Sequence, residues 1–368
     1  MARFWQYRRA MESRASSSAD FARRETAFRR RAFPDARAAD WNDWRWQLRN
    51  RARTPAAFAR TLALSARERR ALAAPETWRM PLGATPYLLS LLAAEAPDGP
   101  LRRTVLPDVR EARRAPGELR DPLGEEAHQV APGLIRSYPR KALLLAAGDC
   151  AGFCRYCTRA RTAGRAPADP ARALAWLRRT PAIRDVLVSG GDPLTLGDGR
   201  LEELLRGLRA IPHIELIRIG TKIPAVLPQR VTPALARMLR KHRPLWLSLH
   251  FTHPAELTPR AAAACGRLLD AGIPLMNQTV LLRGINDDLE TLTRLNEGLL
   301  RLGVKPYYLH QGDLAAGTAH LRSTVARGRA ILRGMCGRTT GYAVPLFMFD
   351  RPGGGGKVPL GPAFAPDR

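Results

Sequence analysis

From about residue 140 onward, short apolar runs alternate with amphipathic segments along the chain. The apolar runs are ALLLAA at 142–147, DVLVSGG at 185–191, ELIRIG at 215–220, LWLSLH at 245–250, PLMNQTVLL at 274–282 and PYYLHQ at 306–311. Segments with the apolar spacing of a helix follow them, at 170–179, 200–210, 232–241, 258–271, 287–302 and 321–337. These strand–helix repeats predict an α/β fold in which parallel strands and covering helices form a partial (β/α)6-type parallel barrel.

The chain before residue 140 has a different pattern and divides into two parts. Residues 1–95 are predicted to be helical, and Trp41, Trp44 and Leu48 fall on one face of a helix within DWNDWRWQLRNR. Residues 96–140 are dense in Pro, Gly and charged residues, which indicates an extended connector. We therefore divide the chain into an N-terminal helical region (1–95), a connector (96–140), the barrel (141–350) and a C-terminal segment (351–368).

Three of the five cysteines lie on one short loop directly after the first predicted strand, in CAGFCRYC: Cys150, Cys154 and Cys157. In barrels of parallel strands the chemistry gathers at the C-terminal ends of the strands. Three thiolates can hold three irons of a four-iron cluster and leave the fourth iron open to a ligand. A zinc site needs a fourth ligand, and a disulfide would leave one cysteine unpaired. The spacing therefore favours a 4Fe–4S cluster that takes part in a reaction.

Length and composition limit the class of protein. The 368 residues contain no apolar run near the ~20 residues that a membrane span needs, and the N-terminus has no signal-peptide core. Since three of five cysteines share one loop, we expect no disulfide framework. Cys265 and Cys336 fall in predicted helices and are expected to be buried thiols. A cytoplasmic protein without a membrane partner fits these features.

The net charge of +27 comes almost entirely from arginine, because the chain has only five lysines. A basic surface attracts phosphates, so RNA binding is an alternative, and one arginine cluster near the N-terminus would suit a phosphate backbone: Arg23, Arg24, Arg29, Arg30 and Arg31. The scarcity of lysine indicates instead a general replacement of surface Lys by Arg. We therefore expect a solvated basic surface and no nucleic-acid partner.

Two glycine-rich segments are further candidates. SGGDPL at 189–194 follows the second predicted strand, where glycines let the backbone approach a ligand. PGGGGK runs from Pro352 to Lys357, and four consecutive glycines cost conformational entropy unless the backbone must pass close to something bulky. A lysine at such a turn can form a Schiff base with pyridoxal phosphate. Alone, PGGGGK is equally consistent with a flexible tail.

Taken together, these segments resemble the lysine 2,3-aminomutase family of radical S-adenosylmethionine enzymes. The resemblance covers nearly the whole chain beyond residue 40, through DWNDWRWQLRNR, PGLIRSYP, CAGFCRYCTR, VLVSGGDPL, IRIGTKIPAVLPQR, HFTHPAEL, NQTVLLRGIND, GYAVPLF and PGGGGK. It implies a radical S-adenosylmethionine barrel and three cofactors: a 4Fe–4S cluster, S-adenosylmethionine and pyridoxal 5′-phosphate. The implied activity is the conversion of L-lysine to β-lysine by migration of the amino group from C2 to C3.

The resemblance also implies how the substrate is held. Arg159 would bind the substrate carboxylate, since a guanidinium suits bidentate pairing. Asp313 and Asp350 would receive the distant ε-ammonium of lysine. A glutamate side chain would be repelled by this acidic pair, so the pair favours a cationic amino acid.

The cofactor contacts are implied in the same way. The cluster ligands would be Cys150, Cys154 and Cys157, and Lys357 would be the Schiff-base lysine. The contacts to S-adenosylmethionine would come from Tyr156, Ser189, Gly190, Gly191 and Asp192. Gln278 ends another predicted strand, where it is equally consistent with facing that cofactor and with a structural hydrogen bond. Tyr138 would contact pyridoxal phosphate, and Arg136 and Lys141 surround that site and could serve its phosphate group, since Ser137 replaces the family's arginine.

Some positions depart from the family pattern. Ser137 replaces an arginine, His310 a tyrosine and Gly312 a cysteine, and no structural zinc is expected. The alternatives are the aminomutase branch that serves β-lysylation of elongation factor P, an aminomutase acting on another amino acid such as arginine, and a radical RNA-modifying enzyme. The expected partners are a small amino acid, a reducing donor such as flavodoxin or ferredoxin, and further copies of the chain in a homo-oligomer.

Overall fold

A computed structural model of the protein describes residues 18–164 and 170–361. In this part of the chain ten strands form one sheet in the order β1 to β10. Its centre consists of parallel strands: β3 (Lys141–Ala147), β4 (Asp185–Gly190), β5 (Leu216–Thr221), β6 (Leu245–Leu249), β7 (Leu275–Leu281), β8 (Lys305–Gln311) and β9 (Leu346–Asp350). The strands β3 to β8 confirm the six predicted runs, and β9 extends the parallel sheet by one strand that the apolar pattern did not predict.

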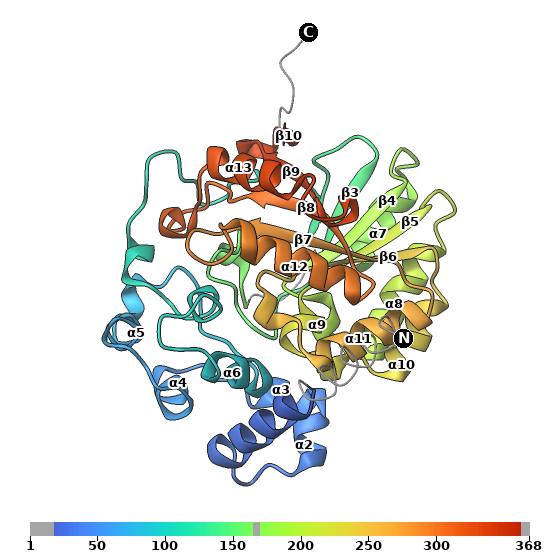
Figure 1. The fold of residues 1–368 in the computed structure, drawn as a ribbon. Helices are drawn as coiled ribbons and strands as arrows, with labels where there is room; N and C mark the ends of the chain where they lie inside the picture. Colours follow the sequence, from blue (N-terminus) through green and yellow to red (C-terminus); the bar gives the residue numbers. More distant parts are fainter. Residues whose placement is uncertain (1–17, 165–169, 362–368) are drawn as a thin grey trace, which may run out of the picture.

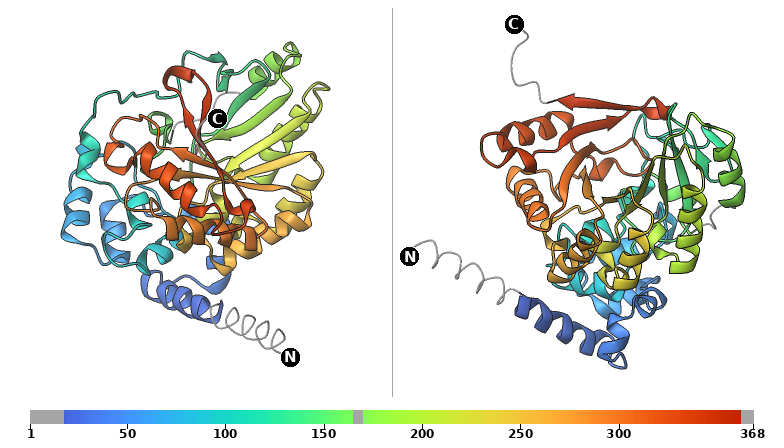
Figure 2. Two further views of the ribbon diagram at one scale, coloured as in Figure 1. Left: turned by 45° about the horizontal axis from the view of Figure 1, so that its top comes forward. Right: turned by 90° about the vertical axis from the view of Figure 1, so that its right-hand side faces the viewer.

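Helices alternate with these strands and cover the outside of the sheet (Figures 1 and 2): α7 (Pro170–Arg178), α8 (Asp198–Arg209), α10 (Pro233–Arg240), α11 (Pro259–Asp270), α12 (Leu289–Arg301) and α13 (Val325–Met335). Each has one apolar face; in α8 the buried residues Leu201, Leu204, Leu205 and Leu208 recur at helical spacing. Threonine oxygens cap α10, α11 and α13 by accepting backbone N–H groups of the first turn. A further short helix, α9 (Ile223–Val226), follows β5.

The two edges of the sheet are antiparallel. The connector contributes β1 (Gln129–Ala131) and β2 (Leu134–Ile135), and β2 pairs with β3. At the other edge β10 (Lys357–Gly361) pairs with β9, so that Lys357 lies opposite Asp350. Within the described residues no strand pairing joins β1 to β10, and the predicted partial barrel is confirmed. Figure 2 shows the β9–β10 hairpin and the first described helix, over 18–32, at opposite ends of the molecule.

The N-terminal region is helical, as predicted: α2 (Ala38–Asn42), α3 (Trp44–Arg49), α4 (Pro55–Thr61), α5 (Ala66–Leu72) and α6 (Pro86–Ala93). The single helix expected around Trp41 and Trp44 is instead two helices separated by Asp43, which caps α3; both tryptophans are buried. The connector contains the short 3-10 turns η2 (Arg102–Thr104) and η3 (Val109–Ala112). In Figure 1 the helices α4, α5 and α6 lie on the side toward which β7 points, and α2 and α3 lie at the bottom.

Side-chain contacts join the N-terminal region to the barrel. The Thr85 hydroxyl donates to the carbonyl of Val226 (2.6 Å), and the Tyr87 hydroxyl bonds to Thr258 (2.6 Å). Both partners follow barrel strands, after β5 and β6. Outside the cysteine loop, Cys265 is buried as predicted, but Cys336 is exposed, because it lies at the C-terminal cap of α13. Among the described helices none has the length and apolarity to cross a membrane.

Candidate active site

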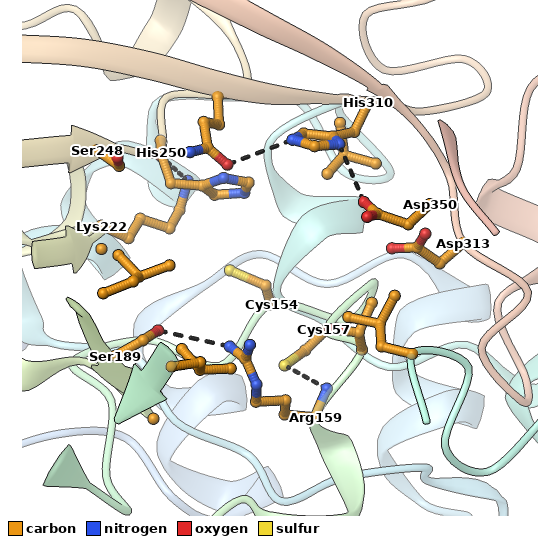
Figure 3. A pocket seen from close by; sticks show the side chains of 18 of the residues that line it. Cys154, Cys157, Arg159, Ser189, Lys222, Ser248, His250, His310, Asp313 and Asp350 are labelled. Atoms are coloured by element: carbon orange, nitrogen blue, oxygen red, sulfur yellow. Dashed lines mark hydrogen bonds and ion pairs between the residues drawn. The ribbon is translucent and has the colours of Figure 1, made fainter. Parts of the chain in front are cut away.

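A cavity of about 760 Å³ lies inside the partial barrel, and its wall runs from the first residues of the strands, such as Lys141 and Asp185, to the loops that follow them. This volume is in the range of small-molecule sites. All three cysteines of the CAGFCRYC loop line it, together with residues from every parallel strand and from the glycine-rich turn before Lys357. Of the residues predicted for the site, only Arg136 is absent from its wall. Figure 3 shows 18 of the lining side chains and labels ten of them.

The cysteine loop turns tightly, because the N–H of Cys157 donates to the carbonyl of Cys154 (3.0 Å). The N–H of Arg159 donates to Sγ of Cys157 (3.3 Å). Burial raises the pKa of Cys150 and Cys154, for Cys154 to about 11. In the described residues no three His, Cys, Asp or Glu side chains converge on a point that could hold one metal ion. Three thiols on one loop could each bind a different iron of a cluster.

Two buried arginines connect the cysteine loop to the N-terminal region. Arg155 is fully buried, and its Nε donates to Oε1 of Glu111 (2.8 Å) while Nη1 donates to the carbonyl of Met80 (2.9 Å). Arg51 is bidentate to Asp149 (2.5 and 2.7 Å) and also donates to the carbonyl of Cys150. The conformation of the loop therefore depends on side chains that precede the barrel by many residues.

The glycines after β4 serve the packing of the chain itself. Gly190 has φ +123°, and a Cβ there would collide with the carbonyl oxygen of Ala147; a Cβ on Gly191 would collide with that of Asp149. Both glycines line the cavity, but the approach of their backbone to the end of β3 and to the cysteine loop already explains why glycine is needed. The close approach expected there is therefore made by the chain's own backbone.

Asp192 likewise has internal partners. Its carboxylate accepts from Thr221 Oγ1 (2.7 and 2.9 Å), from the N–H of Lys222 (2.7 Å) and from that of Leu194 (3.1 Å). It is 5% exposed, and burial raises its pKa. Asp192 therefore joins the loops that follow β4 and β5.

Tyr156, in the cysteine loop, contacts two residues that follow β6. Its hydroxyl bonds to Nε2 of His250 and to Oγ1 of Thr252, both at 2.8 Å. Burial, followed by the charge of Lys222, lowers the pKa of His250 to about 3, so the imidazole is neutral at neutral pH. Lys222 is paired with Glu256 (2.6 Å), and all three residues His250, Lys222 and Tyr156 line the cavity.

Two carboxylates lie together at the far side of the cavity (Figure 3). Burial and then the charge of Asp350 raise the pKa of Asp313 to about 7. Burial would also raise the pKa of Asp350, but a hydrogen bond to His310 and the charge of Lys357 outweigh it and lower the value to about 2. Nζ of Lys357 is 2.5 Å from Oδ2 of Asp350. One carboxylate is thus firmly ionised, and the other titrates near neutral pH.

His310 lies between this pair and Gln278. Its Nδ1 is 3.5 Å from Oδ2 of Asp350, and its Nε2 is 3.3 Å from Oε1 of Gln278. The imidazole is 8% exposed, and burial lowers its pKa. Gln278 and His310 come from the adjacent strands β7 and β8, and together they connect the middle of the cavity wall to the acidic pair.

Lys357 is positioned by the hairpin pairing and by Tyr138. Its backbone N–H donates to the Tyr138 hydroxyl (3.0 Å), and the ring of Tyr138 lies under Nζ of Lys141, 3.6 Å from the ring centroid. Arg218, paired with Asp185 (2.8 Å), lines the same part of the cavity. Arg136 points elsewhere: its guanidinium donates to the carbonyl of Pro139 (3.1 Å) and lines a separate, shallower hollow.

Arg159 is paired within the chain. Its guanidinium bonds to Glu125 through Nη2 (2.7 Å) and Nε (2.8 Å), while Nη1 is 3.5 Å from the hydroxyl of Ser189 (Figure 3). Burial opposes the charge of Arg159, but Glu125 outweighs it and raises the pKa of the guanidinium. Arg159 therefore stays charged at the cavity wall.

Comparison with known proteins identifies the family. Residues 332–365 match the sequence model described as lysine-2,3-aminomutase, and residues 146–295 match that of the radical SAM superfamily. The L-lysine 2,3-aminomutase of Fusobacterium nucleatum is 45% identical over 342 residues, which cover 91% of this chain and 80% of that protein. The chain belongs to the lysine 2,3-aminomutase family. The L-lysine 2,3-aminomutase of Clostridium subterminale is 44% identical, covering 90% of this chain and 81% of that protein. The glutamate 2,3-aminomutase of Clostridioides difficile is 37% identical, covering 88% and 78%.

As a lysine 2,3-aminomutase family member, the protein is an isomerase that uses a 4Fe–4S cluster, S-adenosylmethionine and pyridoxal phosphate. The donor set fits these groups. Three thiols on the cysteine loop line one part of the cavity. Around the other part lie Lys357, Tyr138 and two further cations, Lys141 and Arg218. The cavity thus contains ligands for iron and anion-binding groups for a phosphate.

Sequence reasoning missed several residues of this aminomutase site. Lys222, Arg218, Glu125 and His250 were not predicted. Lys222 directly follows β5 within IRIGTK, where the expectation that chemistry gathers at the C-terminal ends of strands would have found it, whereas Arg218 lies inside β5. No local signal in the sequence identifies Glu125, because its partner Arg159 is 34 residues away.

Proposed function

We propose that this protein converts L-lysine to β-lysine by moving the amino group from C2 to C3. One observation carries the choice of substrate: Asp350 already binds the ε-ammonium of a lysine, that of Lys357, at 2.5 Å and beside Asp313. When Lys357 is engaged by pyridoxal phosphate, two neighbouring buried carboxylates need another cation. The ε-ammonium of a substrate lysine has the matching charge and shape.

The charges at the other side of the cavity support the same substrate. Arg159 lies across from the acidic pair in Figure 3 and is the residue proposed to bind the substrate carboxylate. A cavity with a guanidinium on one side and two carboxylates on the other suits an amino acid with a cationic side chain. A glutamate side chain would meet Asp350 in its ionised form and would be repelled.

The same proposal assigns the cofactor contacts. Cys150, Cys154 and Cys157 would ligate the cluster, and Lys357 would hold pyridoxal phosphate. The contacts to S-adenosylmethionine would come from Tyr156, Ser189, Gly190, Gly191 and Gln278, with Asp192 supporting the loop beneath them. Tyr138, Lys141 and Arg218 would receive the phosphate of pyridoxal phosphate, and Arg136 is left out because it points away from the cavity.

When bound, these cofactors supply a carbon radical and a π system that carries the migrating nitrogen. The residues of the chain supply position and charge. Arg159 and the acidic pair would fix both ends of the substrate, so that its C2 and C3 cannot slide along the cavity. The N-terminal region packs on the loops that follow β5 and β6 and would help to exclude water from the reactive species.

The remaining features are part of the proposal. We place the enzyme in the cytoplasm as a homo-oligomer that receives electrons from a flavodoxin or ferredoxin, on the basis of its family and its cysteine usage. The aminomutase branch of elongation factor P β-lysylation carries out the same isomerisation, so the identity of the substrate does not distinguish that branch from a lysine 2,3-aminomutase with another role. The test below also shows whether arginine or RNA is the substrate instead.

The test is an anaerobic assay of the protein with rebuilt cluster, pyridoxal phosphate, S-adenosylmethionine and dithionite. L-Lysine, L-arginine, L-glutamate and bulk tRNA are offered in parallel, and products are identified by mass spectrometry. We expect β-lysine from lysine and no product from glutamate. Turnover of arginine or glutamate alone would refute lysine as substrate, and modification of tRNA alone would refute the aminomutase reaction.

A further inference from the structure

A loop of the connector, residues 121–128, forms part of the site although its sequence predicts only extended chain. It contains three carboxylates, Asp121, Glu125 and Glu126, which face the two arginines after the last cluster cysteine. Arg161 pairs with all three, at 3.1 Å, 3.2 Å and 2.9 Å. Here we call residues 121–128 the acidic loop.

Within the acidic loop Glu125 alone reaches Arg159. Its carboxylate is 5% exposed and takes the edge of the guanidinium formed by Nε and Nη2, with contacts of 2.7–3.1 Å. Nη1 is left with one long contact, 3.5 Å to the hydroxyl of Ser189. Because a guanidinium is rigid and planar, fixing one edge also fixes the direction of the other.

The acidic loop also holds the turn that precedes Lys357. The N–H of Gly353 donates to the carbonyl of Pro122 (3.1 Å). A Cβ on Gly124 would come within 2.7 Å of the Gly353 backbone, and the ring of His128 packs so closely on Gly354 that a Cβ there would collide with it. One short loop thus contacts both the arginine at one side of the cavity and the glycine turn at the other.

We propose that Glu125 is a positioning residue that aims Arg159 at the substrate carboxylate, and that the acidic loop thereby sets the distance between the carboxylate site and Lys357. This inference rests on the proposed function, since it takes Arg159 as the carboxylate-binding residue. Glu125 neutralises the half-buried guanidinium and occupies its Nε–Nη2 edge. The substrate carboxylate then pairs with the Nη1 side.

The chain offers a matched control. Glu126 is the next residue and is also paired with an arginine, but its partner is Arg161 and its side chain is 72% exposed. Glu125→Gln removes the charge and places an amide N–H₂ against guanidinium donors, so Arg159 loses its fixed direction. Glu126→Gln makes the same chemical change at an exposed pair, where ion pairs contribute little.

The experiment measures binding without turnover. Wild-type, Glu125→Gln and Glu126→Gln proteins are loaded with pyridoxal phosphate, no reductant is added, and visible absorbance follows titration with L-lysine or with L-lysinamide, which lacks the carboxylate. We expect Glu125→Gln to weaken lysine binding by about tenfold or more, because a buried charge pair is broken. Lysinamide binding should change little, and Glu126→Gln should resemble wild type with both ligands.

The outcomes separate the two hypotheses. If wild-type protein binds lysine no better than lysinamide, Arg159 is not the carboxylate site and this part of the proposed function fails. If wild type prefers lysine and Glu125→Gln keeps the same preference, the positioning role is refuted. Should Glu125→Gln not fold, as judged by circular dichroism and iron content, Glu125→Asp takes its place. That shorter acid keeps the charge but not the reach, and an unchanged preference in it would equally refute the role.

Discussion

The two sides of the cavity are built in opposite ways. Around the cysteine loop, buried charges are paired with short contacts: Arg155 with Glu111, and Arg51 with Asp149. At the acidic side, no cation among the described residues is hydrogen-bonded to the Asp313 carboxylate, and burial and the charge of Asp350 raise its pKa to about 7. In the first arrangement each charge is already paired with a residue of the same chain. The second carries a negative charge that a ligand can neutralise.

This difference matches two kinds of task. A cluster loop has to present three thiols in a fixed arrangement, so its supports gain from being fully satisfied. A substrate side has to gain free energy when the substrate arrives, so it retains an unsatisfied charge until then. We therefore propose that the acidic pair selects the substrate and that the N-terminal region stabilises the cysteine loop.

The largest expected effect is at the cysteine loop. Cys154→Ala should leave no stable four-iron cluster, because two thiolates on this loop cannot hold it. Anaerobically reconstituted wild-type protein should contain about four irons per chain, and the variant close to none, with no cleavage of S-adenosylmethionine. Iron and sulfide analysis with electron paramagnetic resonance checks this. A normal cluster signal in the variant would show that Cys154 is not a ligand.

The second effect belongs to the acidic side, where Lys357 is expected to carry pyridoxal phosphate. Borohydride reduction of wild-type protein followed by peptide mapping should find the pyridoxyl group on Lys357. Lys357→Ala should lose this label while its iron content stays normal, because Lys357 has no contact with the cysteine loop. Label on Lys141 or Lys222 would move the cofactor to another part of the cavity.

A third prediction compares two buried ion pairs of the N-terminal part. Glu111 supports Arg155 of the cysteine loop, whereas Glu68 binds Arg102 with the same bidentate geometry (2.7 Å contacts) away from the loop. Glu111→Gln and Glu68→Gln should each destabilise the fold by about 3–5 kcal/mol, since a buried arginine loses its partner. Only Glu111→Gln should also lower the iron content. If the two variants had equal iron content at the same folded fraction, Glu111 would have no specific role in supporting the cysteine loop.

The smallest effect is a pH dependence from Asp313. A protonated Asp313 cannot pair with an ammonium, so lysine should bind more tightly as pH rises through about 7. Of the groups that face Asp313, Asp350 (pKa about 2) stays ionised in this window, burial lowers the pKa of His310, and Glu125 outweighs burial to raise the pKa of Arg159. The KM for lysine should therefore fall by about tenfold between about pH 6 and about pH 8. Asp313→Asn should flatten this profile, and an unchanged profile would assign it to another group.

Much of the fold followed from local pattern. Each buried parallel strand reads as a short apolar run, so β3 to β8 were predictable, and the strand-end rule then located the cysteines. The strand β9 was missed because Leu346–Asp350 is followed at once by Arg-Pro-Gly and has an exposed Leu346. Its place in the sheet comes from pairing with β8, which no local window contains.

The site was harder to predict where roles depend on long-range contacts. Glu125 pairs with a residue in a different element, and the sequence shows only a charged, proline-rich stretch. Arg136 was placed in the site because it is close to Tyr138 in sequence, but its side chain turns to Pro139 outside the cavity. The glycines of SGGDPL were predicted to approach a ligand, and their close contacts prove to be with the backbone of the cysteine loop and β3.

The central claim is that the acidic pair selects the cation of the substrate. It is tested most directly by comparing L-lysine with L-norleucine, which has the same chain length but no ammonium, in the pyridoxal phosphate-loaded protein without reductant. Wild type should prefer lysine by at least about 2 kcal/mol, and Asp350→Asn should lose most of that preference while its affinity for norleucine and its iron content stay unchanged. Equal binding of lysine and norleucine by wild type, or an undiminished preference in Asp350→Asn, would contradict the account.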